Sequence, residues 1–307
     1  MASLASDPLW PRTGDFPDPA AMEGELDVAV VGIPTWRTSL TPGGTGETPE
    51  AIREALRRYS GFLAPDRGVH GGVELGALRV ADFGDADDPH GEAGEARARD
   101  LVARAAARAS VVIALGGDNA LTIPTALGAF GGDLARAGLV TIDAHHDLRD
   151  GASNGSPVRR LIEDYGLDGR RVVQIGIADF ANSAAYSRRA TELGITVIHR
   201  DELLRRPIAD VMAEALQLAG AASGPIHLDV DVDACDRSVA PGCPASVPGG
   251  ISAHELRAAV RTAARHPLLR SIDIAEVDAT ADAPDGRTVR LAALCVLEAL
   301  AGFALRK

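Results

Sequence analysis

The sequence predicts an α/β fold built on a buried sheet of parallel strands. Short aliphatic or β-branched runs of strand length recur along the chain, and Ala-, Leu- and Arg-rich stretches of helical pattern lie between most of them. This alternation is typical of parallel sheets whose faces are covered by helices. The composition agrees, because 46% of the 307 residues are hydrophobic and only 4% are aromatic, which favours a large aliphatic core.

Taken in order, the runs predict eight strands with helices between them. The strand candidates are 26–32, 78–83, 110–115, 139–143, 171–176, 195–198, 225–231 and 270–275. The clearest helical patterns are 94–108, 208–220 and 252–265. Residues 1–25, rich in Pro, Asp and Gly, are interpreted as an irregular arm, and 26–307 as a single domain without linkers or repeats. The pattern leaves open an open sheet or a closed barrel, since both place sites at strand carboxyl ends.

The charge balance restricts the possible partners. The formal net charge is −12 without any Lys/Arg block, so neither nucleic acid nor an anionic membrane fits, because both require a basic footprint. No apolar run approaches the ~18 residues that cross a bilayer, and the first residues lack the pattern of a signal peptide. We therefore expect a cytoplasmic protein. Cys235, Cys243 and Cys295 form no CxxC pair and suit reduced thiols.

Polar residues follow two of the predicted strands at their carboxyl ends. The segment 116–119, Gly-Gly-Asp-Asn, fits a glycine turn with a helix cap when it is taken alone. The segment 143–147, Asp-Ala-His-His-Asp, follows a buried strand directly. On an extended chain Asp143, His145 and Asp147 point to one side, which is a spacing typical of metal ligands.

A third segment is more acidic still. Asp229, Asp231, Asp233 and Asp236 alternate with small or apolar residues on what we interpret as one strand. Like charges on one buried face repel unless a cation neutralises them, although an exposed acidic edge strand is the alternative. Carboxylates with one imidazole suit Mn²⁺ or a similar divalent ion, and two ions balance this charge better than one. Water held between two such ions loses a proton near neutral pH and becomes a nucleophile.

These three segments, in this order, resemble the ureohydrolase family of arginases and agmatinases. The family pattern is a GGDH turn, a DAHxD strand end and a DxDxxDP segment leading to APGxxxPxPGG. Its last part corresponds to 231–250 here, and further similarity at 32–53 and 273–278 extends the resemblance over most of the chain. The resemblance implies the arginase-type three-layer α/β/α sandwich with a parallel eight-stranded sheet, and makes 26–307 one catalytic domain.

The resemblance also implies a set of metal ligands for two Mn²⁺ ions. Counting back from 240–242 places the two metal-binding acids of the third segment on Asp231 and Asp233, rather than on Asp229. Asp143 and Asp231 would bridge the two ions. The implied ligands are Asn119, Asp143, His145, Asp147, Asp231 and Asp233.

Two histidines of the family pattern are replaced in this chain. Asn119 stands where the GGDH histidine binds a metal, and Asn154 stands where arginases place a proton-shuttling histidine. An amide oxygen ligates Mn²⁺ more weakly than imidazole does, so we expect a labile first ion, and asparagine transfers no proton. The proton for the leaving group would then pass through Asp147 as a catalytic residue, or come from another group. The family resemblance also implies a role for Glu276. It assigns Glu276 to the planar cation of the substrate, which a carboxylate binds through paired N–H donors.

The position two residues after the DAHxD motif points to the substrate. Arginases carry a small polar residue there, whereas this chain has Arg149. An arginine at the pocket mouth suits a doubly anionic substrate and would repel the amine of agmatine, and a surface charge without a role in binding is the alternative. The stretches 143–161 and 236–250 look like those of formimidoylglutamases. That resemblance implies hydrolysis of N-formimidoyl-L-glutamate to formamide and L-glutamate. Arg149, Asn154 and Glu276 are then the expected substrate-binding residues.

Two other functions stay open at this point. An agmatinase or guanidino-acid hydrolase of the same family would release urea from a guanidine substrate. A metal-free homologue with a binding or regulatory role is the alternative from another class, since two functional histidines are absent. In each enzymatic case the partner is a small amidine or guanidine, and the family implies a homo-oligomer, either a trimer or a hexamer.

Overall fold

The eight predicted strands pair into one parallel sheet. The computed structural model describes residues 7–65, 71–132 and 134–306, and gives the strand order β4-β1-β5-β10-β9-β6-β7-β8. Because β4 and β8 lie at opposite edges, the sheet is open and not a barrel. The strands of the sheet are β1 (Leu26–Ile33), β4 (Val80–Asp85), β5 (Ala109–Gly116), β6 (Gly138–Ile142), β7 (Val172–Ile177), β8 (Thr196–His199), β9 (Ile226–Asp231) and β10 (Leu269–Ala275).

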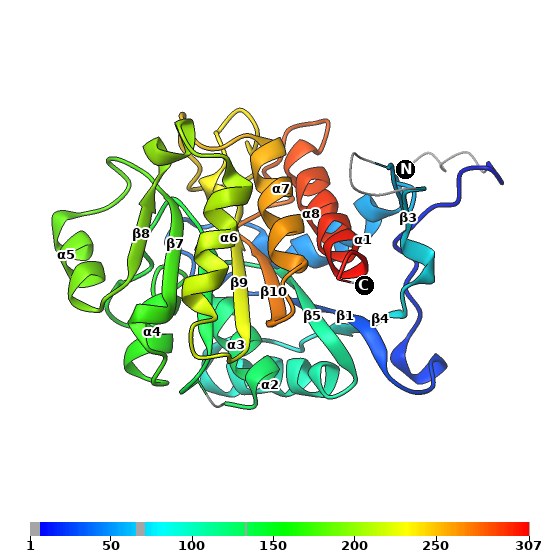
Figure 1. The fold of residues 1–307 in the computed structure, drawn as a ribbon, viewed down its shortest axis with the longest axis horizontal. Coiled ribbons are helices and arrows are strands. Elements are labelled where there is room, and N and C mark those ends of the chain that lie inside the picture. The colour runs from blue at the N-terminus through cyan, green and yellow to red at the C-terminus, as the bar shows by residue number, and fades with distance from the viewer. Residues whose placement is uncertain (1–6, 66–70, 133, 307) are drawn as a thin grey trace.

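Helices cover both faces of this sheet (Figure 1). The three predicted helical patterns correspond to α2, α6 and α7, each with ends shifted by less than one turn. The α-helices are α1 (Thr48–Leu56), α2 (Gly91–Ala106), α3 (Thr122–Phe130), α4 (Pro157–Glu163), α5 (Ala184–Glu192), α6 (Ile208–Ala219), α7 (Ala253–Ala264) and α8 (Arg287–Ala304). The three-layer α/β/α sandwich is therefore confirmed.

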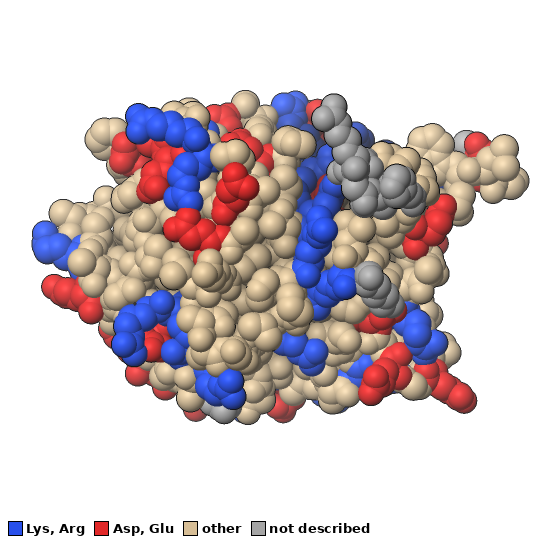
Figure 2. Space-filling model, in the orientation of Figure 1, with Lys and Arg blue, Asp and Glu red and all other residues tan. Residues whose placement is uncertain are grey.

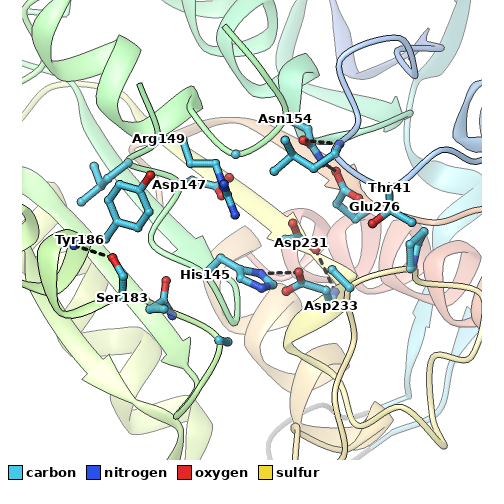
Figure 3. A pocket seen from close by; sticks show the side chains of 17 residues that line it. Thr41, His145, Asp147, Arg149, Asn154, Ser183, Tyr186, Asp231, Asp233 and Glu276 are labelled. Carbon is cyan, nitrogen blue, oxygen red and sulfur yellow. Dashed lines mark hydrogen bonds and ion pairs between the residues drawn. The ribbon is translucent and has the colours of Figure 1, made fainter. Parts of the chain in front are cut away.

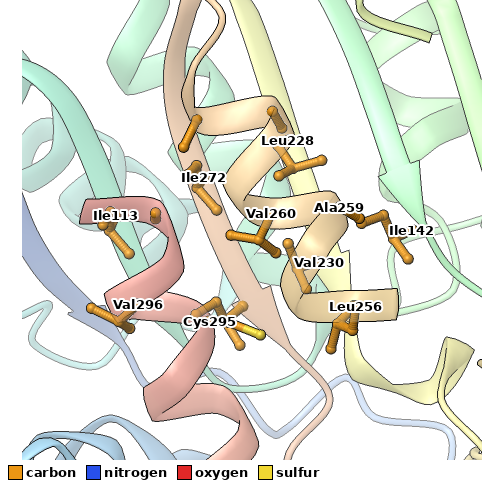
Figure 4. Close-up of a cluster of buried hydrophobic side chains, with 14 of the residues drawn as sticks. Ile113, Ile142, Leu228, Val230, Leu256, Ala259, Val260, Ile272, Cys295 and Val296 are labelled. Carbon is orange, nitrogen blue, oxygen red and sulfur yellow. The ribbon is translucent and has the colours of Figure 1, made fainter. Parts of the chain in front are cut away.

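The core is aliphatic, as the composition predicts, and lies in two layers on either side of the sheet. On one face α1, α6, α7 and α8 pack against strand residues such as Leu228 and Ile272, with Val260 of α7 between them (Figure 4). On the other face, α2, α3 and α4 cover the sheet. Side chains of β9 alternate between these layers, and those on the α3 side are the polar ones. This alternation aims the acids of β9 away from the larger aliphatic layer.

The described part of the N-terminal arm is held against the sheet domain. It contains one short 3₁₀ helix, Pro19–Ala21, and the Arg108 guanidinium donates hydrogen bonds to the carbonyl oxygens of Pro19, Met22 and Gly24. A small hairpin of β2 (Phe62–Leu63) and β3 (Val73–Glu74) lies outside the main sheet. The division into an arm at 1–25 and a catalytic domain at 26–307 stays a prediction.

Charged side chains on the surface include ion pairs that join neighbouring helices. Figure 2 shows basic side chains along the line of α8 on this face, with acidic ones nearby. Two arginines of α7, Arg257 and Arg261, donate to the buried carboxylate of Glu298 on α8, so they join these helices. In the part of the chain that the structure describes, no helix is long and apolar enough to cross a membrane.

Candidate metal centre and substrate pocket

The polar motifs of the sequence meet at one cavity of about 290 Å³ above the carboxyl ends of the central strands. β6, β9 and β10 are neighbours in the sheet, so the residues that follow them come together, as parallel strands require. Figure 3 shows the side chains that point into this cavity. His145, Asp147, Asp231 and Asp233 lie at its floor, while Arg149 lies at its mouth.

Three predicted ligands form a cluster of metal-binding dimensions. His145 Nδ1 lies 2.7 Å from Asp233 Oδ2 and 3.5 Å from Asp143 Oδ1. One possible ligand atom from each of these residues falls within 4.8 Å of the others. The other carboxylate oxygen of Asp143, Oδ2, is buried and has no hydrogen-bond partner among the described residues. A buried acceptor without a donor is costly, so the cluster fits a cation that would take that place.

The chain reaches this arrangement by bending, and not along extended strands as expected. β6 ends at Ile142, and Asp147 has a left-handed backbone with φ of 54°. β9 ends at Asp231, while Asp233 lies on the 3₁₀ turn Val232–Ala234 and Asp236 lies beyond that turn. The expectation of acids alternating along single strands was therefore wrong beyond Ile142 and Asp231. Turns at the strand ends bring the carboxylates together.

The electrostatics of the cavity floor favour the binding of a cation. Burial raises the pKa of Asp143 and Asp231 well above its usual range, and the Asp233 carboxylate raises both further. Burial alone would lower the pKa of His145, but the carboxylates of Asp233, Asp231 and Asp147 together outweigh it and raise this pKa to about 10. Without a cation, Asp143 and Asp231 therefore hold their protons more tightly than free carboxyl groups do, whereas His145 is protonated at neutral pH. Divalent ions would displace these protons.

Asn119 and Asp147 lie together beside this cluster. Asn119 Nδ2 donates to Asp147 Oδ2 at 2.7 Å, and its Oδ1 accepts from Thr122 Oγ1 at 2.9 Å. The amide oxygen therefore faces Thr122, and its use as a ligand requires the carboxamide to turn over. Burial raises the pKa of Asp147 to about 7. The metal-binding role of Asn119 stays a prediction, whereas its proximity to Asp147 is established.

Glu276 lies on the opposite wall from His145 (Figure 3). It follows β10 with a left-handed backbone, φ 62°, which is rare for a residue with a side chain. Its Oε1 accepts from the Asn119 backbone N–H at 2.8 Å and from Asn154 Nδ2 at 2.9 Å. Burial raises its pKa to about 8. Asn154 therefore orients Glu276, and these two of the three predicted substrate-binding residues belong to one hydrogen-bonded group.

Arg149 lines the same cavity as Glu276. Its backbone is fixed, because its N–H donates to the Gly155 carbonyl at 2.9 Å and its carbonyl accepts from Arg159 Nε at 2.8 Å. The guanidinium, in contrast, makes no hydrogen bond or ion pair with any residue that the structure describes. A free cation with anchored backbone is suited to bind an anion that enters from solvent.

The loop after β7 also lines the cavity, and sequence reasoning missed it. Asn182 Oδ1 accepts from the His146 N–H at 3.0 Å, and Nδ2 donates to the Ala144 carbonyl at 2.9 Å, so Asn182 holds the backbone on both sides of His145. Ser183 and Tyr186 line the mouth near Arg149. The available signal was the position of Asn182 and Ser183 just after a predicted strand, where parallel sheets place their sites.

A second polar group is fully buried beneath the metal cluster. His227 Nδ1 lies 2.8 Å from Ser271 Oγ, and His227 Nε2 lies 3.0 Å from Asp273 Oδ2. Asp229, their neighbour on β9, has no donor to either carboxylate oxygen among the described residues, and burial together with Asp273 raises its pKa. All four side chains are fully buried. The group resembles a nucleophilic triad, but its side chains are closed off from solvent, so a substrate would not reach it.

The sequence and the fold of this chain are similar to those of known proteins. The sequence pattern of the arginase family matches residues 26–302. This chain belongs to the arginase family. The formimidoylglutamase of Bacillus subtilis is 33% identical over 285 residues, covering 90% of this chain and 87% of that protein. Guanidinobutyrase of Pseudomonas aeruginosa is 30% identical, covering 91% and 88%.

The fold comparison agrees with the family assignment. A crystal structure of the Bacillus subtilis formimidoylglutamase superposes with a TM-score of 0.88 at 30% identity, covering 99% of this arginase-family chain and 95% of the other. The predicted arginase-type sheet is thereby confirmed as the fold of the family. The resemblance found in the sequence is confirmed as well, since relatives named formimidoylglutamase cover most of the chain.

Proposed function

We propose that this arginase-family chain hydrolyses a C–N bond of a linear amidine, and that its substrate is N-formimidoyl-L-glutamate. The observation that carries the proposal is the free Arg149 guanidinium at the mouth of the cavity that holds Glu276. An amidinium suits the buried carboxylate of Glu276, and a carboxylate suits Arg149. Formimidoylglutamate carries both groups. The likeness to formimidoylglutamases supports this choice.

The donor set fits a pair of divalent metal ions. Buried carboxylates with raised pKa values and one imidazole suit Mn²⁺ better than a thiolate-preferring ion. When bound, such ions supply an activated water as the nucleophile. The residues that would hold them are Asn119, Asp143, His145, Asp147, Asp231 and Asp233.

Each remaining group then has a task in the reaction. Glu276, held by Asn154, would accept N–H bonds from the amidinium and fix the formimidoyl carbon over the floor. Water oxygen adds to that carbon, and the bond from the carbon to the glutamate nitrogen breaks. The departing nitrogen needs a proton, which Asp147 would take from the attacking water and deliver. Formamide and L-glutamate result.

A steady-state assay with Mn²⁺ tests the proposal. We expect glutamate and formamide from formimidoylglutamate, with kcat/KM at least tenfold above that for agmatine, whose cationic tail meets Arg149. Release of urea from agmatine or guanidinobutyrate, with no glutamate from formimidoylglutamate, would refute the proposed substrate.

A guanidino-acid hydrolase is the second candidate, because the relative named guanidinobutyrase also covers most of the chain, and a carboxylate tail would again suit Arg149. The metal-free regulatory alternative is tested by metal analysis. Fewer than one ion per chain after dialysis with excess Mn²⁺ would support it. The trimeric or hexameric state implied by the family stays a prediction, which light scattering of the Mn²⁺-loaded protein would check.

A further inference from the structure

Residues 154 and 155 contact both ends of the substrate pocket. At the inner end, the Asn154 side chain donates to Glu276 Oε1 at 2.9 Å. At the mouth, the carbonyl of Gly155 accepts the Arg149 N–H at 2.9 Å. Two consecutive residues therefore hold the amidine-binding carboxylate and the backbone of Arg149.

The pair is itself fixed by neighbouring segments. Asn154 Oδ1 accepts from the Leu40 N–H at 3.2 Å, and its own N–H donates to the Thr38 carbonyl at 3.4 Å. Arg159 braces the same loop, because its guanidinium donates to the carbonyl oxygens of Arg149 and Gly151. The loop is thus anchored on both sides and cannot follow a displaced Arg149 freely.

The side chain of Arg149 occupies the space that a side chain at position 155 would need. A Cβ placed on Gly155 would lie 2.7 Å from Arg149 Cδ and 3.1 Å from Nε. No backbone atom is among its three nearest contacts, and the backbone of Gly155 is not left-handed. An added methyl group would therefore displace the flexible arginine rather than break the loop.

We propose that Gly155 is a positioning residue that sets the place of the Arg149 guanidinium, and that the Asn154-Gly155 pair thereby fixes the spacing between the amidine-binding and carboxylate-binding ends of the pocket. The inference rests on the proposed function for the identity of the anion. It makes Gly155, which itself lines the cavity, a determinant of substrate length through its effect on Arg149. Only a substrate whose carboxylate stands at the matching distance from its amidine engages both ends.

A double-mutant cycle on Gly155 and Arg149 tests this. In the Mn²⁺-loaded enzyme, Gly155→Ala raises KM for formimidoylglutamate about tenfold or more with kcat changed less than about threefold, because a charge-assisted contact is lost. In the Arg149→Ala background the same change alters KM less than about twofold, since no Cδ remains to be displaced. Gly76→Ala is the matched control. Gly76 has an ordinary backbone, and an added Cβ there meets nothing within 4 Å.

Melting curves of the same proteins separate positioning from folding. If Gly155→Ala lowers Tm, we expect the Arg149→Ala double variant to recover the Tm of Arg149→Ala. Equal KM increases or equal Tm losses in both backgrounds would overturn the inference, as would an unchanged KM in Gly155→Ala. A wild type that hydrolyses guanidinobutyrate but not formimidoylglutamate refutes only the proposed substrate, and the cycle is then measured on guanidinobutyrate. A wild type that accepts only agmatine overturns both.

Discussion

The buried carboxyl group of Glu276 should make the metal-free protein less stable as the pH rises. Burial raises its pKa from the ordinary 4.5 to about 8. An acid whose pKa is higher in the fold than in the unfolded chain holds its proton more tightly when folded. Its contribution to stability is therefore complete below about pH 4.5 and is lost as the pH rises toward 8. The perturbation is the replacement Glu276→Gln, which keeps the acceptor oxygen and removes the titration.

The size of the effect follows from the shift. Each pKa unit corresponds to about 1.36 kcal/mol, so between pH 5 and 8 the ionisation of Glu276 costs the fold about 4 kcal/mol. With an unfolding entropy of about 2.1 cal/mol/K per residue, this amounts to about 6 °C in Tm for a chain of 307 residues. Asn119 and Asn154 still find an acceptor in the variant, because the glutamine amide oxygen occupies the place of Oε1.

Calorimetry of chelator-treated protein at pH 5 and pH 8 measures this directly. We expect the Tm of Glu276→Gln, relative to wild type, to rise by about 6 °C between these pH values. The comparison cancels the other titrating groups, including Asp147 and His145, whose raised pKa values also destabilise the fold as pH rises. A difference that stays constant within about 1 °C would refute the assigned burial of the Glu276 charge. Added Mn²⁺ should raise Tm most at pH 8, where the carboxylates are ionised.

Three further changes test the site. Arg149→Ala should raise KM for formimidoylglutamate by about tenfold to a hundredfold at nearly constant kcat, and an unchanged KM in steady-state kinetics would remove the carboxylate contact. Asn119→Ala should lower the affinity for one of two Mn²⁺ ions by about tenfold or more, as measured by titration calorimetry. Two binding events with unaltered affinity would show that Asn119 is not a ligand. Ser271→Ala should retain activity and lower the free energy of unfolding in urea by about 1–3 kcal/mol, because His227 loses one of its two buried partners. An inactive but stable variant would instead assign Ser271 a catalytic role.

The strands and the meeting of their ends could be predicted from the sequence for a physical reason. An aliphatic run of strand length has few ways to be buried other than in a covered parallel sheet, and the carboxyl ends of such strands share one edge. The strand pattern therefore predicts that the acids at the ends of 139–143 and 225–231 lie close together. The resemblance supplied the choice of Asp231 and Asp233 over Asp229, which the pattern of acids alone does not distinguish.

The course of the chain around the site could not be predicted. Asp147 and Glu276 both have left-handed backbones, and neither is a glycine, the residue type that predicts this conformation from sequence most reliably. These turns depend on packing between distant segments, which the local sequence does not indicate. The contacts of Asn182 with the segment around His145 have the same origin, since they join residues 36 and 38 positions apart.

Asn182 has a consequence for how substrate preference can change in this protein. The loop that borders the pocket mouth also provides the two hydrogen bonds that hold the backbone around His145. Substitutions that adapt Ser183 or Tyr186 to a new substrate tail therefore act one residue or one helical turn away from a support of the metal cluster. New specificity can arise at this loop only in combinations that leave Asn182 in place, so the retention of metal limits the range of tails that the enzyme can come to accept.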